Sequence, residues 1–252
     1  MTDLVKISEA NGVMEILWNR PDKKNALSNV MYRAATAALA RAAEDKSIRV
    51  VVLASEGDSF TSGNDLADFA SVAMGGEAPA AHGFIEAMIQ FPKPIVAAVA
   101  GLAIGVGTTM LLHCDLVYVA SDAKLTTPFV SLALVPEAAS SMLLPARIGH
   151  ARSFAMFALG EGFTGAQAAQ LGLANAALPK EEVLAAARKA AATLAQRPIG
   201  AVMATKKLMR DASILAHSRT EGAIFAERLH SAEATEAFTA FQQKRAPDFS
   251  KL

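Results

Sequence analysis

The sequence predicts an α/β fold in which strand–strand–helix units repeat and a helical tail follows. Uninterrupted runs rich in β-branched residues, such as IRVVVLASEG and KPIVAAVAG, are typical of strands buried on both faces. Stretches with helical periodicity alternate with these runs, and beyond Pro179 the helical pattern continues almost to the end of the chain. We find no low-complexity linker between the units.

The first predicted elements are a hairpin and a helix. VKISEANGVMEILWN contains two alternating strands around Asn11-Gly12, a residue pair that favours hairpin turns. Residues 28–44 are predicted to form a helix with Ser28 as its N-cap. Small or apolar residues recur on one face of this helix at Met31, Ala35, Leu39 and Ala42.

The middle of the chain alternates strands, loops and helices. IRVVVLASEG leads into the loop DSFTSGNDLADF and a helix near 81–90, and KPIVAAVAG leads into a glycine-rich turn and a helix from about Gly107. DLVYVAS and KLTTP are extended, and helices and glycine turns alternate after them. The tail breaks at Arg197-Pro198 and near Ser231. We therefore divide the chain into a core, 1–196, and a C-terminal helical region, 197–252, that packs on its own or a neighbouring subunit.

Composition excludes several classes of function. The 252 residues carry 24 Lys and Arg against 24 Asp and Glu, so there is no general basic field for nucleic acid or an anionic membrane. The single cysteine, Cys114, rules out an internal disulfide framework and suits a reducing compartment. No histidine pairs with an acid or a cysteine at ligand spacing, so no metal is indicated, and His113 is expected to satisfy local hydrogen bonds.

Three features bear on location. Residues 94–112 are uncharged and approach the ~20 residues of a membrane span, but their internal glycines favour a buried strand, turn and helix. The N-terminal residues have no basic region followed by an apolar stretch, so no secretory signal is predicted. The chain ends in Ser250-Lys251-Leu252, a tripeptide that can act as a peroxisomal address. The Ala-rich composition looks bacterial, so we expect a cytoplasmic protein, with a peroxisomal location as the alternative.

Two loops share one design, in which a strand is followed by small residues and then a helix. They are SFTSGNDLADF and GLAIGVGTTML. Glycine lets a ligand approach the backbone closely, and amides at a helix start attract negative charge. Two converging loops of this kind could hold one oxyanion between two backbone N–H groups. Spacing alone leaves the alternative that each is only a tight turn in a packed core. Neither loop is a dinucleotide fingerprint or a P-loop.

Several motifs in order carry a resemblance to a known family. LWNRPDKKNALS, FTSGNDLADF, FPKPIVAAVAGLAIGVGTTMLLHCDLVYVA and TPFVSLALVPEAASSMLLPARIGHARS resemble the crotonase (enoyl-CoA hydratase/isomerase) superfamily along nearly the whole chain. TSGNDL, TPF and VPEAASS look most like the peroxisomal-type Δ3,Δ2-enoyl-CoA isomerases. The resemblance implies a spiral of ββα units, C-terminal helices that trimerise, and trimers that can pair into hexamers. It also implies an acyl-CoA substrate in fatty acid metabolism and no cofactor beyond the CoA of that substrate.

The resemblance implies roles for particular residues. The backbone N–H groups of Asn64 and Val106 would form the oxyanion hole for the thioester oxygen. The remaining matched positions are expected to contact substrate: Ser62, Gly63, Asp65 and Leu66 line it, Ala26 lies near the adenine, and Phe225 and Lys244 contact CoA from a neighbouring subunit, Lys244 meeting phosphate charge.

Departures from the family pattern bear on the chemistry. The two positions where hydratases carry glutamates hold Thr109 and Phe129, and neither can act as a carboxylate base. Glu137, within LALVPEAASSMLLP, instead matches the single catalytic glutamate of the peroxisomal-type isomerases. Apolar neighbours would raise its pKa and exclude water. The alternative is a solvated carboxylate in a first helical turn after Pro136.

These observations predict an enzyme that isomerises 3-enoyl-CoA to trans-2-enoyl-CoA through Glu137. Hydration of 2-enoyl-CoA is the alternative, and it requires a second acid or base, for which Asp68 is a candidate. A third possibility, of another class, is a CoA-binding paralogue without turnover that uses the fold as an assembly surface.

Overall fold

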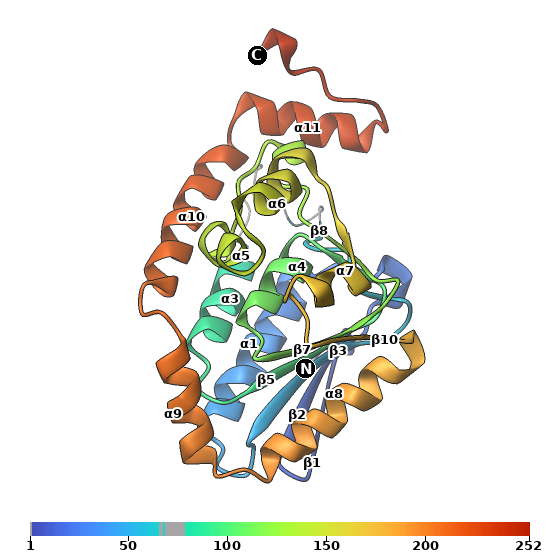
Figure 1. Ribbon diagram of the computed structural model, residues 1–252. Helices are drawn as coiled ribbons and strands as arrows, with labels where there is room; N and C mark the ends of the chain where they lie inside the picture. Colours follow the sequence, from blue (N-terminus) through green and yellow to red (C-terminus); the bar gives the residue numbers. More distant parts are fainter. Residues whose placement is uncertain (1, 66–67, 69–78) are drawn as a thin grey trace.

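Two sheets organise the chain. The computed structural model describes residues 2–65, 68 and 79–252 (Figure 1). The larger sheet has the strand order β1-β2-β3-β5-β7-β10; β1 and β2 are antiparallel and the other neighbours are parallel. Its strands are β1 (Val5–Ala10), β2 (Val13–Trp18), β3 (Val50–Ser55), β5 (Ile95–Val99), β7 (Leu116–Ala120) and β10 (Ala176–Leu178).

The smaller sheet has the order β4-β6-β8-β9, in which only β8 and β9 are antiparallel. Its strands are β4 (Ser59–Thr61), β6 (Leu102–Ile104), β8 (Lys124–Thr126) and β9 (Phe163–Thr164). Three times the chain leaves a strand of the larger sheet and enters one of the smaller sheet: β3 to β4, β5 to β6, and β7 to β8. This confirms the predicted α/β spiral of strand–strand–helix units.

The helices of the first two thirds are short, apart from α1. They are α1 (Asn29–Glu44), α3 (Ala81–Gln90), α4 (Val106–Thr109), α5 (Ser140–Ile148), α6 (His150–Phe154) and α7 (Gly165–Gln170). The 3₁₀ turns are η1 (Pro21–Lys23), η2 (Met110–His113) and η3 (Val130–Leu132), and a π-helix, η4, spans Ala155–Leu159.

The C-terminal region is helical, as predicted. It contains α8 (Lys180–Ala195), α9 (Ile199–Met209), α10 (Ile214–Leu229), α11 (Ala232–Gln242) and a final 3₁₀ turn, η5 (Phe249–Lys251). Helix α8 packs across the larger sheet, whereas α9, α10 and α11 run along one side and end of the molecule (Figure 1). Helix α10 contacts α3 and α5, so the tail packs on its own chain.

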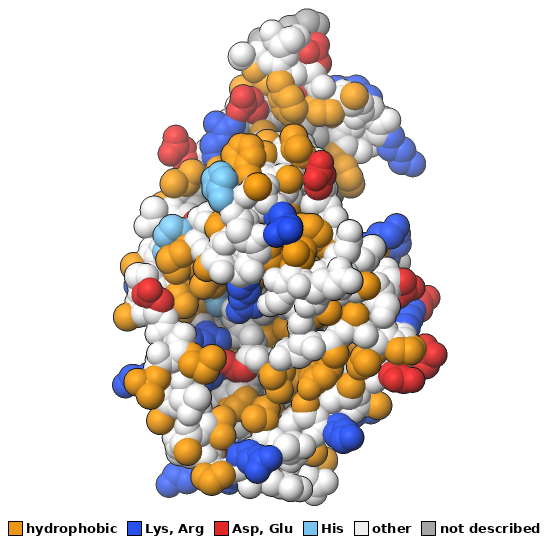
Figure 2. All heavy atoms as spheres, viewed as in Figure 1, with side chains coloured by type: hydrophobic (Ala, Val, Ile, Leu, Met, Phe, Trp, Pro, Cys, Tyr) orange, Lys and Arg blue, Asp and Glu red, His pale blue; other side chains and the backbone are white. Residues whose placement is uncertain are grey.

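Residues 94–112 lie in the interior, as expected, and form β5, β6, α4 and most of η2. Within the part of the chain that the structure describes, no helix is both long and apolar enough to cross a membrane. On the face drawn in Figure 2, acidic and basic side chains are scattered singly and in small mixed groups, in keeping with the balanced charge.

The structure corrects two details. Ser28 occupies the N-cap position of α1, but its hydroxyl makes no capping hydrogen bond; the carboxylate of Asp68 accepts from the backbone N–H of Asn29 at 2.6 Å instead. The tail also has a break at 210–213, between α9 and α10, that the periodicity did not reveal. Long-range contacts override the local signal in the first case, and a short loop without glycine or proline escapes it in the second.

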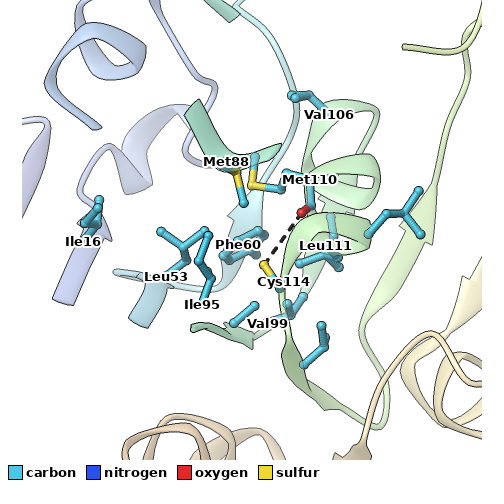
Figure 3. Close-up of a cluster of buried hydrophobic side chains, with 14 of the residues drawn as sticks. Ile16, Leu53, Phe60, Met88, Ile95, Val99, Val106, Met110, Leu111 and Cys114 are labelled. Carbon is cyan, nitrogen blue, oxygen red and sulfur yellow. Dashed lines mark hydrogen bonds between the residues drawn. The ribbon is translucent and has the colours of Figure 1, made fainter. Parts of the chain in front are cut away.

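The core lies between the larger sheet and the helices above it. Figure 3 shows Phe60 and Leu53 from the strands packed toward Met88 of α3 and toward Met110 and Leu111 of η2. The side chain of Val106, at the start of α4, is 1% exposed. Buried apolar side chains therefore hold the backbone of α4 in place, and the removal of these side chains from water stabilises the fold.

Two glycines offer a matched test of backbone constraint. Gly101 has a φ of +77°, and a Cβ there would lie 1.8 Å from the carbonyl oxygen of Asp58. Gly83 sits in α3, where no described atom lies within 4 Å of an added Cβ. We expect Gly101→Ala to lower the free energy of unfolding by about 3 kcal/mol. Gly83→Ala should raise it by about 0.5–1 kcal/mol. Urea unfolding of both variants measures this, and a neutral Gly101→Ala would contradict the geometry.

Candidate active site

The parallel pairing of β4 with β6 brings the two glycine loops to one sheet edge. Ser59 pairs with Leu102 and Thr61 with Ala103. A Cβ at Gly63 would lie 2.9 Å from the carbonyl oxygen of Ile104. A Cβ at Gly107 would lie 2.4 Å from Cγ2 of Thr61. The two loops are therefore in direct contact, and glycine is what permits the approach.

The backbone N–H of Asn64 points away from Leu27, the residue with which Asn64 is bridged. Residue Leu27 forms a parallel bridge with Asn64: its N–H donates to the carbonyl of Gly63 at 2.8 Å, and its carbonyl accepts from Asp65 at 2.9 Å. This pattern uses the groups on either side of Asn64 and turns its own N–H to the opposite side. Among the described residues, that N–H has no hydrogen-bond partner.

The amide of Val106 is the first of α4. Gly105, with a φ of +57°, precedes it, and the first N–H groups of a helix have no partner within the helix. The N–H groups of Thr108 and Thr109 both donate to the carbonyl of Gly105, whereas none of the described atoms accepts from Val106. Counting only partners in the part of the chain that the structure describes, the edge of the smaller sheet thus carries two unpaired backbone donors on loops in contact.

Glu137 is buried on an unusual turn. It is 6% exposed, and the next two residues, Ala138 and Ala139, have left-handed φ values of 61° and 54°. Helix α5 begins only at Ser140. The alternative of a solvated carboxylate in a first helical turn is therefore wrong, because the carboxylate precedes the helix and faces inward.

The environment of Glu137 favours a proton. Burial raises its pKa to about 7; a hydrogen bond from the Thr109 hydroxyl opposes the rise, and the nearby charge of Glu221 adds to it. Thr109 lies three residues after Val106, on the same short helix. The carboxylate is thus tied to the helix whose first N–H is unpaired.

Tyr32 links Asn64 to the same centre. Its hydroxyl donates to Oδ1 of Asn64 at 2.5 Å from within the core, where the Tyr32 side chain also packs against Phe84. Burial raises the pKa of Tyr32 well above its ordinary value, and the charges of Glu137 and Asp68 add to the rise. Asn64, Tyr32 and Glu137 therefore belong to one cluster. Sequence reasoning missed Tyr32, because its partner Asn64 lies 32 residues further along the chain.

The chain matches one family model over almost its full length. Residues 8–251 match the model described as enoyl-CoA hydratase/isomerase. The chain belongs to the enoyl-CoA hydratase/isomerase family. The resemblance found from the motifs is thereby confirmed, and the protein is an enzyme of this family.

Some relatives of this chain are named isomerases and others are named hydratases. A rat protein, enoyl-CoA delta isomerase 2, is 34% identical over 82% of this chain; the match spans 54% of the rat protein, about half its length. The 2,3-dehydroadipyl-CoA hydratase of Escherichia coli is 30% identical over 99% of both chains. The solved structure of Pseudomonas aeruginosa OdaA is 43% identical, covers 95% of this chain and 99% of its own, and superposes with a TM-score of 0.91.

Thr109 and Phe129 stand at the two positions where the motif resemblance leads to the expectation of glutamates in a hydratase. Thr109 donates to Glu137, and Phe129 is buried with its ring centroid 6.2 Å from that of Phe157. Asp68, the candidate second acid, accepts a hydrogen bond from Asn29 at the start of α1. Asp65 pairs with Arg20 at 2.5 Å.

The residues expected to contact CoA fall into two groups. Ala26 precedes Leu27, which bridges to Asn64, so the structure brings Ala26 beside Ser62, Gly63 and Asp65. Leu66 lies outside the described residues. Phe225 is buried on α10 with its ring edge-on to His82, and Lys244 is exposed just after α11, which packs chiefly on η3 and α10. Within one chain these tail positions are not part of the loop cluster.

His113 behaves as predicted from sequence. It is buried, burial lowers its pKa to about 3, and its Nε2 lies 2.8 Å from the carbonyl oxygen of Ala138. A neutral ring facing a carbonyl must carry its proton on Nε2, so His113 donates to the turn after Glu137. His113 also lines a cavity of about 700 Å³ between the core, α8 and α9, together with apolar residues, several cations and Asp115, which pairs with Lys206 and Arg210.

The pKa of Glu137 predicts a pH-dependent cost. Between pH 4.5 and about 7 the native state keeps a proton that the unfolded chain has released, so stability falls as pH rises through this window. In Glu137→Gln this loss is absent. We expect the variant to gain on wild type by up to about 3 kcal/mol from pH 4.5 to pH 8. Chemical unfolding at several pH values measures the difference. The exposed Glu227→Gln is the control, and parallel pH curves for Glu137→Gln and wild type would refute the raised pKa.

Proposed function

We propose that this enzyme isomerises 3-enoyl-CoA to trans-2-enoyl-CoA, with Glu137 as the only acid–base group. The observation that carries the proposal is one buried carboxylate, with a pKa raised to about 7, beside two loops that each present a backbone N–H without a partner among residues 2–65, 68 and 79–252. A base and an oxyanion site are the two components that enolate chemistry requires.

The proposed reaction is a stepwise proton transfer. The carboxylate of Glu137 removes a proton from C2, and the electron pair of the C2–H bond moves onto the thioester oxygen to give a dienolate. The N–H groups of Asn64 and Val106 donate to that oxygen; removing one such donor typically costs ~2.7–4 kcal/mol in the transition state. Glu137, now neutral, returns the proton to C4 as the C2–C3 double bond forms. The carboxylate is regenerated, so no co-reactant is consumed.

A pKa near 7 suits both halves of this cycle. A carboxylate with its ordinary pKa is a weak base, and burial strengthens it. The same group must then give its proton back, which a much stronger base would resist. Exclusion of water by the surrounding core also prevents loss of the proton before it reaches C4.

The residues at the positions expected for a second carboxylate support isomerisation over hydration. Hydration by the usual family route uses two carboxylates, and the two corresponding positions are Thr109 and Phe129. Asp68 is engaged at the start of α1. The rat relative named as a delta isomerase agrees with this proposal, while the Escherichia coli relative named as a hydratase provides the alternative to be tested.

Substrate binding completes the proposal. Ser62, Gly63 and Asp65 line the substrate near the oxyanion amides, and Ala26 lies near the adenine of CoA. In a homotrimer or a pair of trimers, Phe225 and Lys244 act at the CoA of a neighbouring subunit, where the Lys244 charge meets phosphate.

Deuterium exchange tests the assignment directly. Wild type is incubated with a 3-enoyl-CoA and, separately, with a 2-enoyl-CoA in deuterated water, and the products are identified by mass. We expect conversion of the 3-enoyl substrate without hydration, and a loss on the order of 10²–10⁴-fold in Glu137→Gln, the range that general acid–base catalysis contributes.

Control measurements separate the alternatives. Glu227→Gln should react like wild type. The affinity for CoA should be nearly unchanged in Glu137→Gln, because the substitution leaves the backbone N–H groups of Asn64 and Val106 in place. Formation of 3-hydroxyacyl-CoA that survives in Glu137→Gln would show that the glutamate is structural. Binding of CoA without any proton exchange in wild type would favour a paralogue without turnover.

Thr109 offers a second test. Its hydroxyl stabilises the charged form of Glu137, so Thr109→Val should raise the pKa of Glu137 further. The acid limb of the kcat profile should therefore move to higher pH, so that activity is lost at neutral pH and below and recovers above the raised pKa. Thr109→Ser keeps the donor and is expected to retain the wild-type limb. An identical limb in all three proteins would mean that another group controls the rate.

A further inference from the structure

We propose that Glu221, on α10 of the C-terminal region, is a positioning residue for Glu137: it holds the left-handed turn that presents Glu137 and places a second negative charge behind it. This inference rests on the proposed acid–base role of Glu137. No motif in the sequence pointed to Glu221, which lies 80 residues beyond the residue it binds.

Glu221 is built into the start of α5. Its side chain is 7% exposed, and its Oε1 accepts from the backbone N–H of Ser141 at 2.8 Å and from the Ser141 hydroxyl at 2.5 Å. His217, one turn earlier on α10, places Nε2 2.8 Å from the same hydroxyl. A carboxylate from one helix thus accepts from a backbone N–H in the first turn of another, an arrangement that the helix dipole favours.

The turn between Glu137 and Ser141 needs such support. Ala138 and Ala139 both have left-handed φ values, a conformation that is unfavourable for any residue with a Cβ atom. His113 binds the carbonyl of Ala138 from the core side, while Glu221 binds the turn from the tail side. Two buried side chains from distant segments therefore fix the backbone that aims Glu137.

Glu221 also acts through its charge. Burial raises the pKa of Glu221, and the hydrogen bonds from Ser141, the charge of His217 and the backbone N–H of Ala139 oppose that rise. The charge of Glu221 in turn raises the pKa of Glu137. Oε2 of Glu221 is buried and, within the described residues, has no hydrogen-bond partner; the ionisable contact of the carboxylate is made at Oε1, where Nε2 of His217 lies 3.5 Å away.

Other ionisable groups around this pair are accounted for element by element. Tyr32 on α1 faces Glu137 and stays protonated, and His113 on η2 is neutral. On α3, which packs on α10, Glu86 is paired with Arg219, and the burial of His82 lowers its pKa. His217 is thus the ionisable group in direct contact with Glu221 on its own helix.

Two variants separate geometry from charge. Glu221→Gln keeps an oxygen that can accept from Ser141 but removes the charge, and Glu221→Ala removes both. We expect Glu221→Gln to retain kcat at its plateau within several-fold while its acid limb moves to lower pH. Glu221→Ala should lose kcat on the order of 10²-fold, with KM little changed, because the misaimed carboxylate reacts poorly. Glu227→Gln, an exposed substitution on the same helix, should leave both quantities at wild-type values.

A measurement without turnover keeps this inference separate from the proposed function. The pH dependence of unfolding is compared between Glu221→Gln and Glu221→Gln/Glu137→Gln, which reports the pKa of Glu137 directly. That pKa should be lower than in the wild-type background, even if the substrate is another acyl-CoA. If the Glu221→Ala protein does not fold, the pKa of Glu137 measured in Glu221→Gln still tests the inference. An unmoved pKa of Glu137 together with wild-type kcat in a folded Glu221→Ala protein would overturn the inference.

Discussion

The parallel contact between β4 and β6 is the constraint on which the rest of the site depends. Parallel strands end at the same edge of a sheet, so the loops after them must share one space. Gly63 and Gly107 remove the Cβ atoms that would hold these loops apart. Val106 then fixes α4 by its buried side chain, and Leu27 fixes Asn64 by its backbone. The unpaired amides are thus a result of strand pairing and not of any special side chain.

The buried carboxylate of Glu137 lowers the stability of the fold, and the same burial raises its pKa. An ionised group in the interior is expensive unless it is paired, and Glu137 has one hydroxyl and no cation among its described contacts. The cost appears as a higher affinity for a proton. Packing elsewhere offsets it, with the larger sheet and α8 supplying most of the apolar contact. Two consecutive left-handed alanines beside a buried carboxylate combine backbone strain and burial, a combination that is typical of functional sites.

Much of this arrangement could be predicted because its signals are local. Asn11-Gly12 fixed the hairpin, β-branched runs fixed the buried strands, and the glycines of both loops marked where a backbone approaches closely. The apolar letters around Glu137 indicated a raised pKa. Tyr32, Glu221 and the capping role of Asp68 escaped, because each depends on a partner that is remote in sequence. No spacing rule links a tail helix to a turn 80 residues earlier.

The link between Ser141 and Glu221 also has a consequence for how the protein is made. Residues that contact over a long sequence separation meet only after the intervening chain has formed, and such contacts slow folding. During synthesis the strand pairings of the core can form first, while the turn after Glu137 still lacks its partner. The turn after Glu137 is therefore completed late, when α10 has emerged and docked on α5, so the core of a nascent chain can form well before this turn is held in place.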